Sequence, residues 1–308
     1  MKGVMPPADR PIDTSVQLPH VDWRAAPSGT QRRLAGFLDV LDVDAADVPA
    51  HPDALPRLRR GELQAVVVHG VYGADTLATL VRRLQQHDPP FLRSSFPAPF
   101  HAGFYGRNLN LCTDLAGYFR EAAAFNTHLQ ELGPPAAPLH RRVGDLLAAL
   151  DGGRPLLAAP GPQPGQHYMF TTLRHHDGGG YIPPHFDNEV MLRPSYVHLA
   201  QTVQAHIVSF VLALTQAQRG GALVVFDHHC APHEAGLIND DRARAASARP
   251  DTAGLASVRF SLPPGCLIVL DSGRWLHRLS PVEGDISRWS ACSFIACSRD
   301  DRVQLAWG

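Results

Sequence analysis

The chain of 308 residues contains one lysine, Lys2, among its 28 basic residues. This scarcity excludes a phosphate-binding P-loop and a Schiff-base lysine anywhere beyond the N-terminus. The five cysteines form no C-x-x-C pair, so neither a zinc ribbon nor a disulfide framework is indicated. The sequence also lacks an apolar run long enough for a transmembrane helix, and its first residues lack the apolar core of a signal peptide. We therefore expect a soluble protein of the reducing cytoplasm.

Charge of one sign is also missing, since the formal net charge is only −1. A balanced chain gives no electrostatic reason to expect nucleic acid or a membrane surface as a partner. Hydrophobic residues make up 44% of the sequence, which is enough to bury one large core or two modest ones. The oligomeric state is left open.

The pattern of the chain changes twice along its length. Residues 1–60, rich in Pro, Asp and Ala, are expected to form a partly irregular N-terminal extension, followed by a single domain over 61–308. Within that domain, residues 61–160 are predicted to be mainly helical and to support the β-rich second half. The run LQAVVVHG (63–70) predicts a buried strand there, and helical patterns follow at 76–87, 114–132 and 141–153.

The second half of the domain, residues 161–308, is rich in short β-prone runs separated by turns. Seven such runs predict a β-sandwich or jelly roll, and therefore an α+β protein whose helices come from the N-terminal half. An insert is expected at about 228–256. The runs lie at 167–175, 180–186, 206–214, 222–227, 256–262, 266–271 and 287–296.

The 17 histidines make a metal site the first chemistry to consider. In a strand, the motif H-x-D points both side chains to the same face, where they can hold one ion. Of the four copies, two lie in the N-terminal extension (20–22 and 51–53), and the copy at 175–177 runs into three glycines. The remaining copy, His185 and Asp187, ends an apolar run and is the best candidate.

A later run offers a different group, because Arg288, Ser290, Cys292 and Phe294 share one face of its predicted strand. A buried guanidinium needs an anionic partner, and no acidic residue alternates with Arg288. Either this arginine binds an anionic ligand, or it lies in water at the edge of the sheet.

Together, PPHFDNE, the strand GGALVVFD, His277 and the R-x-S at Arg288 resemble the iron(II)/2-oxoglutarate-dependent oxygenases over about residues 165 to 298. The resemblance implies a double-stranded β-helix, the cupin-like jelly roll. It implies that His185, Asp187 and His277 bind Fe(II). Two histidines and one carboxylate on one face of the ion are the ligand set of non-haem iron sites. It further implies that Arg288 and Ser290 hold the far carboxylate of 2-oxoglutarate, and that dioxygen takes the remaining metal position.

The reaction implied is the oxidation of an unactivated C–H bond of a small molecule, with release of succinate and CO2. The resemblance makes an amino acid or a natural-product intermediate the expected substrate. Halogenating relatives carry a small residue in place of the carboxylate ligand, so Asp187 favours oxygenation. Hydroxylation, desaturation and ring closure stay open.

Residues on the strand before His185 are candidates for further contacts. The resemblance suggests His175 as a group that helps to hold 2-oxoglutarate. Arg174 points the other way in a regular strand, so only one of the two can face the site. We favour Arg174 as a grip for a substrate carboxylate, with Tyr168 and Thr172 on the same face.

Two alternatives to a small-molecule oxygenase remain. One is a protein hydroxylase of the same superfamily, which would need an open groove. The other is a non-enzymatic, cupin-like metal-binding protein, which would have no use for an inward Arg288. The His-rich stretch DHHCAPHE (227–234) matches no standard zinc spacing and is more readily interpreted as a loop near the substrate.

Overall fold

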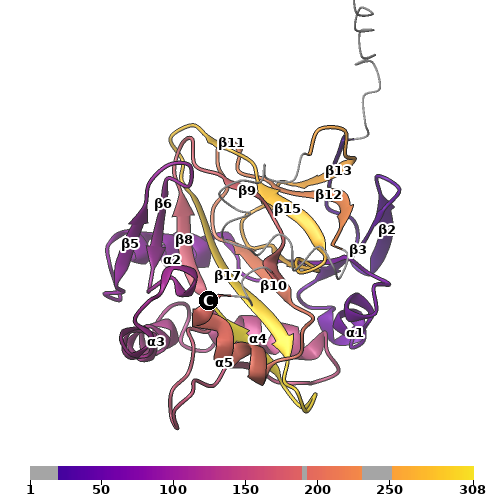
Figure 1. The fold of residues 1–308 in the computed structure, drawn as a ribbon. Coiled ribbons are helices and arrows are strands. Elements are labelled where there is room, and N and C mark those ends of the chain that lie inside the picture. The colour runs from indigo at the N-terminus through magenta and orange to yellow at the C-terminus, as the bar shows by residue number, and fades with distance from the viewer. Residues whose placement is uncertain (1–19, 189–192, 231–251) are drawn as a thin grey trace, which may run out of the picture.

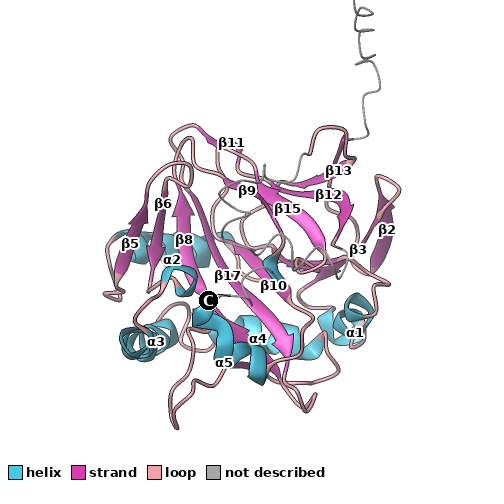
Figure 2. Ribbon diagram, viewed as in Figure 1, coloured by secondary structure: helices cyan, strands magenta, loops and turns pink. Residues whose placement is uncertain are grey.

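The structure is a computed structural model that describes residues 20–188, 193–230 and 252–308. Two β-sheets face each other, and helices lie below the larger sheet in the view of Figure 1. All seven predicted β-prone runs form strands. The arrangement confirms the α+β class and the jelly-roll core, with helices and sheets distributed as Figure 2 shows.

The larger sheet carries the far wall of the site described below. Its neighbouring strands are antiparallel, except that β3 is parallel to β4 and β18 is parallel to β7. In sheet order it contains β2 (Thr30–Leu34), β3 (Leu38–Asp44), β4 (Ala65–His69), β14 (Leu267–Leu270), β10 (Val208–Ala213), β17 (Arg288–Cys297), β8 (Thr172–His176), β6 (Ala102–Tyr105) and β5 (Arg93–Phe96), with β18 (Gln304–Trp307) and β7 (Leu156–Ala158) continuing from β17.

The smaller sheet carries the predicted metal ligands. In sheet order it contains β1 (His20–Asp22), β13 (Ser257–Phe260), β12 (Leu223–His229), β15 (Trp275–Leu279) and β9 (Ile182–His185). A separate two-stranded ribbon joins β11 (Arg219–Gly220) to β16 (Val282–Glu283). The expected insert falls between β12 and β13, and its residues 231–251 lie outside the described part of the chain.

The helices bury apolar faces against the larger sheet. Helix α3 begins where the sequence predicted, since the Asp114 side chain accepts a hydrogen bond from the Gly117 N–H at 2.9 Å. No helix within the described ranges is long and apolar enough to cross a membrane. The helices are α1 (Ala54–Arg59), α2 (Ala74–Gln85), α3 (Leu115–Gln130), α4 (Leu139–Ala149) and α5 (Val197–Thr202), with short 3-10 turns at Val48–Ala50, Leu109–Leu111 and Pro194–Tyr196.

The boundary expected at residue 60 does not separate two structural units. Strand β3 pairs with β4 across that boundary, so residues 30–44 belong to the larger sheet. The cause is the run LDVLDV, whose Val40 and Val43 are fully buried. Residues 61–160 are likewise not only helical, because they supply four strands of the same sheet.

Alternation along the strands of the larger sheet divides the interior into two parts. Val66, Val269 and Trp289 point toward the helices, where they join a large apolar core with Tyr118 and Phe125. Residues of opposite phase point toward the smaller sheet. At one end of that space they form a second core, here called the apolar end: Val40, Ala65, Val67, Ile268, Val225, Val258 and Phe260. At the other end they line a cavity.

Candidate metal centre

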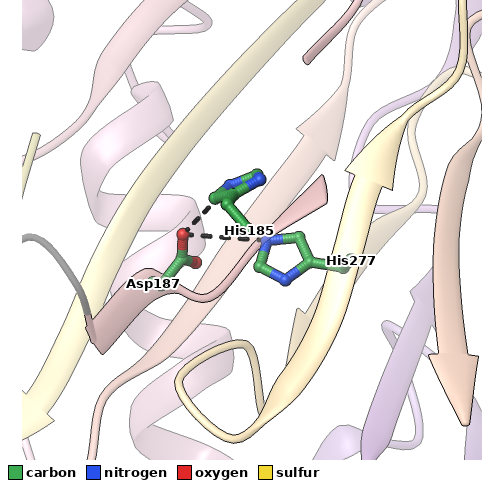
Figure 3. Close-up of side chains that lie close together, drawn as sticks. All are labelled: His185, Asp187 and His277. Atoms are coloured by element: carbon green, nitrogen blue, oxygen red, sulfur yellow. Dashed lines mark ion pairs between the residues drawn. The ribbon is translucent and has the colours of Figure 1, made fainter. Parts of the chain in front are cut away.

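Strand pairing brings the three predicted metal ligands together. His185 ends β9 and lies directly opposite His277 of β15 in the antiparallel register. Asp187 follows two residues after His185, and its backbone N–H donates to the Ser272 carbonyl at 3.0 Å. The two Nε2 atoms lie 3.4 and 3.7 Å from Asp187 Oδ1, for His185 and His277 respectively (Figure 3). All three ligand atoms fall within 4.8 Å of one another.

Each imidazole is oriented by its own strand. Nδ1–H of His185 donates to the Pro183 carbonyl at 2.8 Å, and Nδ1–H of His277 donates to the Trp275 carbonyl at 3.0 Å. Because a carbonyl can only accept, these bonds fix the tautomer and leave both Nε2 lone pairs directed toward Asp187. Backbone partners of this kind are typical of metal-binding histidines.

The local electrostatics also suit a cation. Burial by itself would raise the pKa of Asp187, but the neighbouring His277 and His185 and the nearby Ser272 hydroxyl keep that pKa below its usual value. The pKa of His277 is lowered to about 4 by burial and by the adjacent His185. At neutral pH the site therefore offers a carboxylate and unprotonated imidazole, the states that bind metal. Within the described residues, no second group of three such side chains lies this close together.

Arg288 lies at the start of β17 and is 7% exposed. Burial, followed by the proximity of Arg174, lowers its pKa to about 10. Its Nη1 donates to Ser290 Oγ at 3.3 Å, and no carboxylate of the described residues forms an ion pair with it. A buried guanidinium without an anion is costly, so the site fits an anionic ligand.

A cavity of about 360 Å³ joins Arg288 to the three ligands. The cavity wall includes Thr172, Arg174 and His176, which alternate along β8. They lie beside β17 residues whose side chains point to the same side of the sheet, because Arg174 pairs with Ser290 and Thr172 pairs with Cys292. The structure thus places Arg174 and Thr172 in the cavity wall, and their contact with a substrate stays a prediction.

His175 lies on the opposite face of β8 and does not line the cavity. Its ring packs against Trp289 in a tilted arrangement, with the centroids 4.5 Å apart, and its Nδ1 is 3.0 Å from Asp177 Oδ1. It also covers Gly103, where an added Cβ would lie only 2.1 Å from His175 Nε2. The expectation that His175 helps to hold 2-oxoglutarate is therefore corrected, because strand alternation gives the inward position to Arg174.

Tyr168 also lies away from the cavity, contrary to expectation. The strand begins only at Thr172, so the alternation that would align Tyr168 with Arg174 does not extend back to it. Its ring is buried against Phe119, with the centroids 4.9 Å apart, in the core beneath the larger sheet.

Other parts of the cavity wall were not predicted, among them His176 and three phenylalanines. His176 is 1% exposed, and neither ring nitrogen has a hydrogen-bond partner. Its pKa is lowered to about 2, first by burial and then by Arg174 and Arg288. The alternation that included Arg174 could have identified it. Phe96, Phe100 and Phe104 come from the β5–β6 hairpin, and no motif marked them.

The His-rich stretch 227–234 is described only in part. His228 lies near Phe186 and His229 near Trp275, with ring centroids 5.8 and 5.4 Å apart. His233 and Glu234 lie outside the described residues.

Comparison with known proteins gives a family and a fold. A family model described as "carrier-protein-independent halogenase WelO5" matches residues 37–308. A search of curated proteins finds no match. Among solved structures, an N-substituted L-amino acid dioxygenase from Burkholderia ambifaria AMMD, in complex with alpha-KG, superposes with a TM-score of 0.54 at 17% identity, covering 83% of this chain and 91% of that one. A 2OG-Fe(II) oxygenase family oxidoreductase from Burkholderia pseudomallei gives 0.45 at 15% identity, with coverages of 94% and 99%.

Proposed function

Since the chain belongs to the carrier-protein-independent halogenase WelO5 family, within the iron(II)/2-oxoglutarate-dependent oxygenases, we propose that it hydroxylates a C–H bond of a small molecule. The family makes it an enzyme that uses Fe(II), 2-oxoglutarate and dioxygen. The proposed substrate is an amino-acid derivative or a natural-product intermediate. One oxygen atom enters the product and the other enters succinate, with loss of CO2. The observation that carries the proposal is that the His185, Asp187 and His277 cluster lines a cavity whose wall also contains the buried Arg288.

The residues of the chain divide the work of holding the reactants. His185, Asp187 and His277 would hold the iron, and Arg288 with Ser290 would bind the far carboxylate of 2-oxoglutarate by charge-assisted hydrogen bonds. When bound, the metal and cosubstrate supply the oxidant that breaks the C–H bond. The buried neutral ring of His176 fills the space beside Arg288 and excludes water without competing for the anion.

Asp187 supports oxygenation over halogenation, although the family description names halogenases. Its carboxylate fills the third protein position next to both imidazoles, the position that the sequence resemblance associates with a small residue in halogenating relatives. In reactions run with excess chloride or bromide, we expect the product mass to increase by one oxygen. A halogenated product would contradict this.

The size of the cavity supports a small molecule over a protein substrate. Its volume of about 360 Å³ lies at the lower end of the range for small-molecule sites. A non-enzymatic metal-binding role is not favoured, because it leaves Arg288 without a purpose.

An anaerobic titration tests the proposal. Iron(II) followed by 2-oxoglutarate should produce a weak visible charge-transfer band, and Arg288→Ala should abolish it at ordinary cosubstrate concentrations. The exposed Arg259→Ala serves as the matched control and should leave the band unchanged. If the wild-type protein gives no band, the proposed function is wrong.

A further inference from the structure

Three phenylalanines form one side of the cavity, here called the aromatic wall: Phe96, Phe100 and Phe104. Phe96 lies with its ring centroid 4.5 Å from that of Phe104 and 6.4 Å from that of Phe100. The wall belongs to the β5–β6 hairpin at the edge of the larger sheet, beyond β8. Its apolar area favours an apolar body, and flat ring faces favour a planar one.

Arg174 stands where this wall meets the metal centre. Its guanidinium carbon lies 5.9 Å from the centroid of Phe104, the residue directly opposite on β6. Arg174 is also close enough to His277 and Arg288 to lower the pKa of each. Its Nε is buried without a hydrogen-bond partner, and Arg174 forms no ion pair with any described residue. The guanidinium is therefore available to a ligand in the cavity.

The cosubstrate does not account for Arg174. Under the proposed function, one carboxylate of 2-oxoglutarate binds the metal and the other binds Arg288, so both of its charges already have partners. Arg193 also lines the cavity, and its Nε is likewise buried without a partner.

Among the described residues that line the cavity, Asp187 has the only side-chain carboxylate, and Arg278 adds another cation. The carboxyl group of Gly308 also lies in the wall, where its oxygen accepts a hydrogen bond from the Tyr118 hydroxyl at 2.9 Å. With Fe(II) bound, the cavity stays positively charged even after the dianionic cosubstrate has entered.

We propose that the substrate presents an oxyanion, either carboxylate or phosphate, to Arg174 and lays an apolar planar body on the aromatic wall. It carries no free ammonium group, because Arg174 and Arg193 would repel one, and Asp187, the only side-chain carboxylate of the described wall, would be bound to the metal. A free amino acid is thereby disfavoured relative to one whose nitrogen is blocked. This inference rests on the proposed function and narrows its substrate class.

Four probes that share one body separate the head groups: 3-phenylpropanoate, 3-phenylpropyl phosphate, 3-phenylpropanol and 3-phenylpropylamine. Each is titrated calorimetrically into the protein loaded with iron(II) and 2-oxoglutarate without oxygen. We expect at least one of the two anions to bind about 10- to 100-fold more tightly than the alcohol, and the amine to bind least. The ranking of carboxylate and phosphate identifies the oxyanion. Equal binding of amine and anion, or no binding of either anion at millimolar concentration, overturns the proposal.

Variants assign the effect to its residues. Arg174→Gln should remove the preference for the anion and leave the affinity for the alcohol unchanged, whereas Arg174→Lys should retain part of it. Phe104→Leu should lower the affinity for the alcohol probe and for the anionic probes by a similar factor. Arg259→Gln, an exposed arginine on β13, is the matched control.

The charge-transfer band distinguishes failure of this inference from failure of the proposed function. If the wild-type band forms but the head groups bind alike, only the inference is wrong. If Arg174→Gln abolishes the band and spares probe binding, Arg174 serves the cosubstrate and the inference is overturned.

Discussion

The space between the two sheets has an apolar end and a cavity end, and the same strands serve both. On β14, Ile268 lies in the apolar end, and Leu270 belongs both to this second core and to the cavity wall. On β10, Ala213 belongs to the second core, Val211 both packs against it and lines the cavity, and Ser209 lines the cavity. The buried side chains of the apolar end pack against one another. At the cavity end, Arg288, Arg174 and His176 have fewer hydrogen-bond partners than their polar groups need. Stability and ligand binding are thus separated by only a few residues along a strand.

The largest expected effect comes from removing the carboxylate ligand at the cavity end. Asp187→Ala should weaken iron(II) binding by more than about 100-fold, because the loss of a direct ligand exceeds that of a supporting contact. Anaerobic equilibrium titration measures it. Asp177→Ala alters the carboxylate of a neighbouring H-x-D motif and should leave the affinity unchanged. Undiminished iron binding by Asp187→Ala would contradict the metal centre.

Truncation of a side chain at the apolar end should lower stability and leave iron(II) binding nearly unchanged. Ile268 is fully buried, so Ile268→Ala should lower the free energy of unfolding by about 3 kcal/mol through lost burial and a new cavity. Urea denaturation measures this loss. Iron(II) affinity, measured as for Asp187→Ala, should change little. A large loss of iron affinity in a folded variant would show that the two ends are coupled.

Replacing the unpaired guanidinium should stabilise the iron-free protein. Arg288→Met keeps most of the side-chain volume and removes a buried charge, so the free energy of unfolding should rise by about 1 kcal/mol. The protection that 2-oxoglutarate gives the wild-type protein against thermal unfolding should disappear. Arg274→Met is the contrasting control and should destabilise, because Arg274 pairs with the buried Asp271. Destabilisation by Arg288→Met would mean that the guanidinium has an internal partner.

The smallest effect concerns a polar contact beside the apolar end. A hydrogen bond to Asp42, 3.0 Å away, and a contact with Cys266 raise the pKa of His69 to about 9. Because the folded-state pKa is raised, this stabilisation is complete below the unfolded pKa of about 6.5 and is lost as the pH rises toward 9. We expect a loss of about 1 kcal/mol after solvent screening, measured by urea denaturation at several pH values. His69→Gln should abolish this dependence, and an unchanged profile would contradict it.

The sequence allowed prediction of features whose cause is local. The β-prone runs were recognisable because their apolar residues are continuous or alternate, and Arg288 was notable because no acidic residue accompanies it. Strand β15 was not predicted around His277, since its sequence WLHRL has no β-branched residue. The place of β3 in the larger sheet depends on pairing with β4, which the sequence pattern does not specify.

The walls of the cavity were harder to predict than the metal ligands. His185 and Asp187 share a motif, whereas Phe96 and Phe104 reach the site only because β6 pairs with β8. That contact depends on sheet order, which short spacing rules do not encode. His175 shows the converse: its sequence position suited a role in the site, but the alternation of β8 directs it to Trp289.

The two carbonyls that orient the imidazoles have a consequence for how such proteins diversify. Pro183 and Trp275 each lie two residues before the histidine they hold, so both contacts are internal to a single extended segment. Neither of these two hydrogen bonds involves the hairpin or β8, so those parts can be exchanged without loss of either contact. New substrate specificities can therefore arise by substitutions in the hairpin and β8 while the two segments that orient the metal-binding histidines stay unchanged.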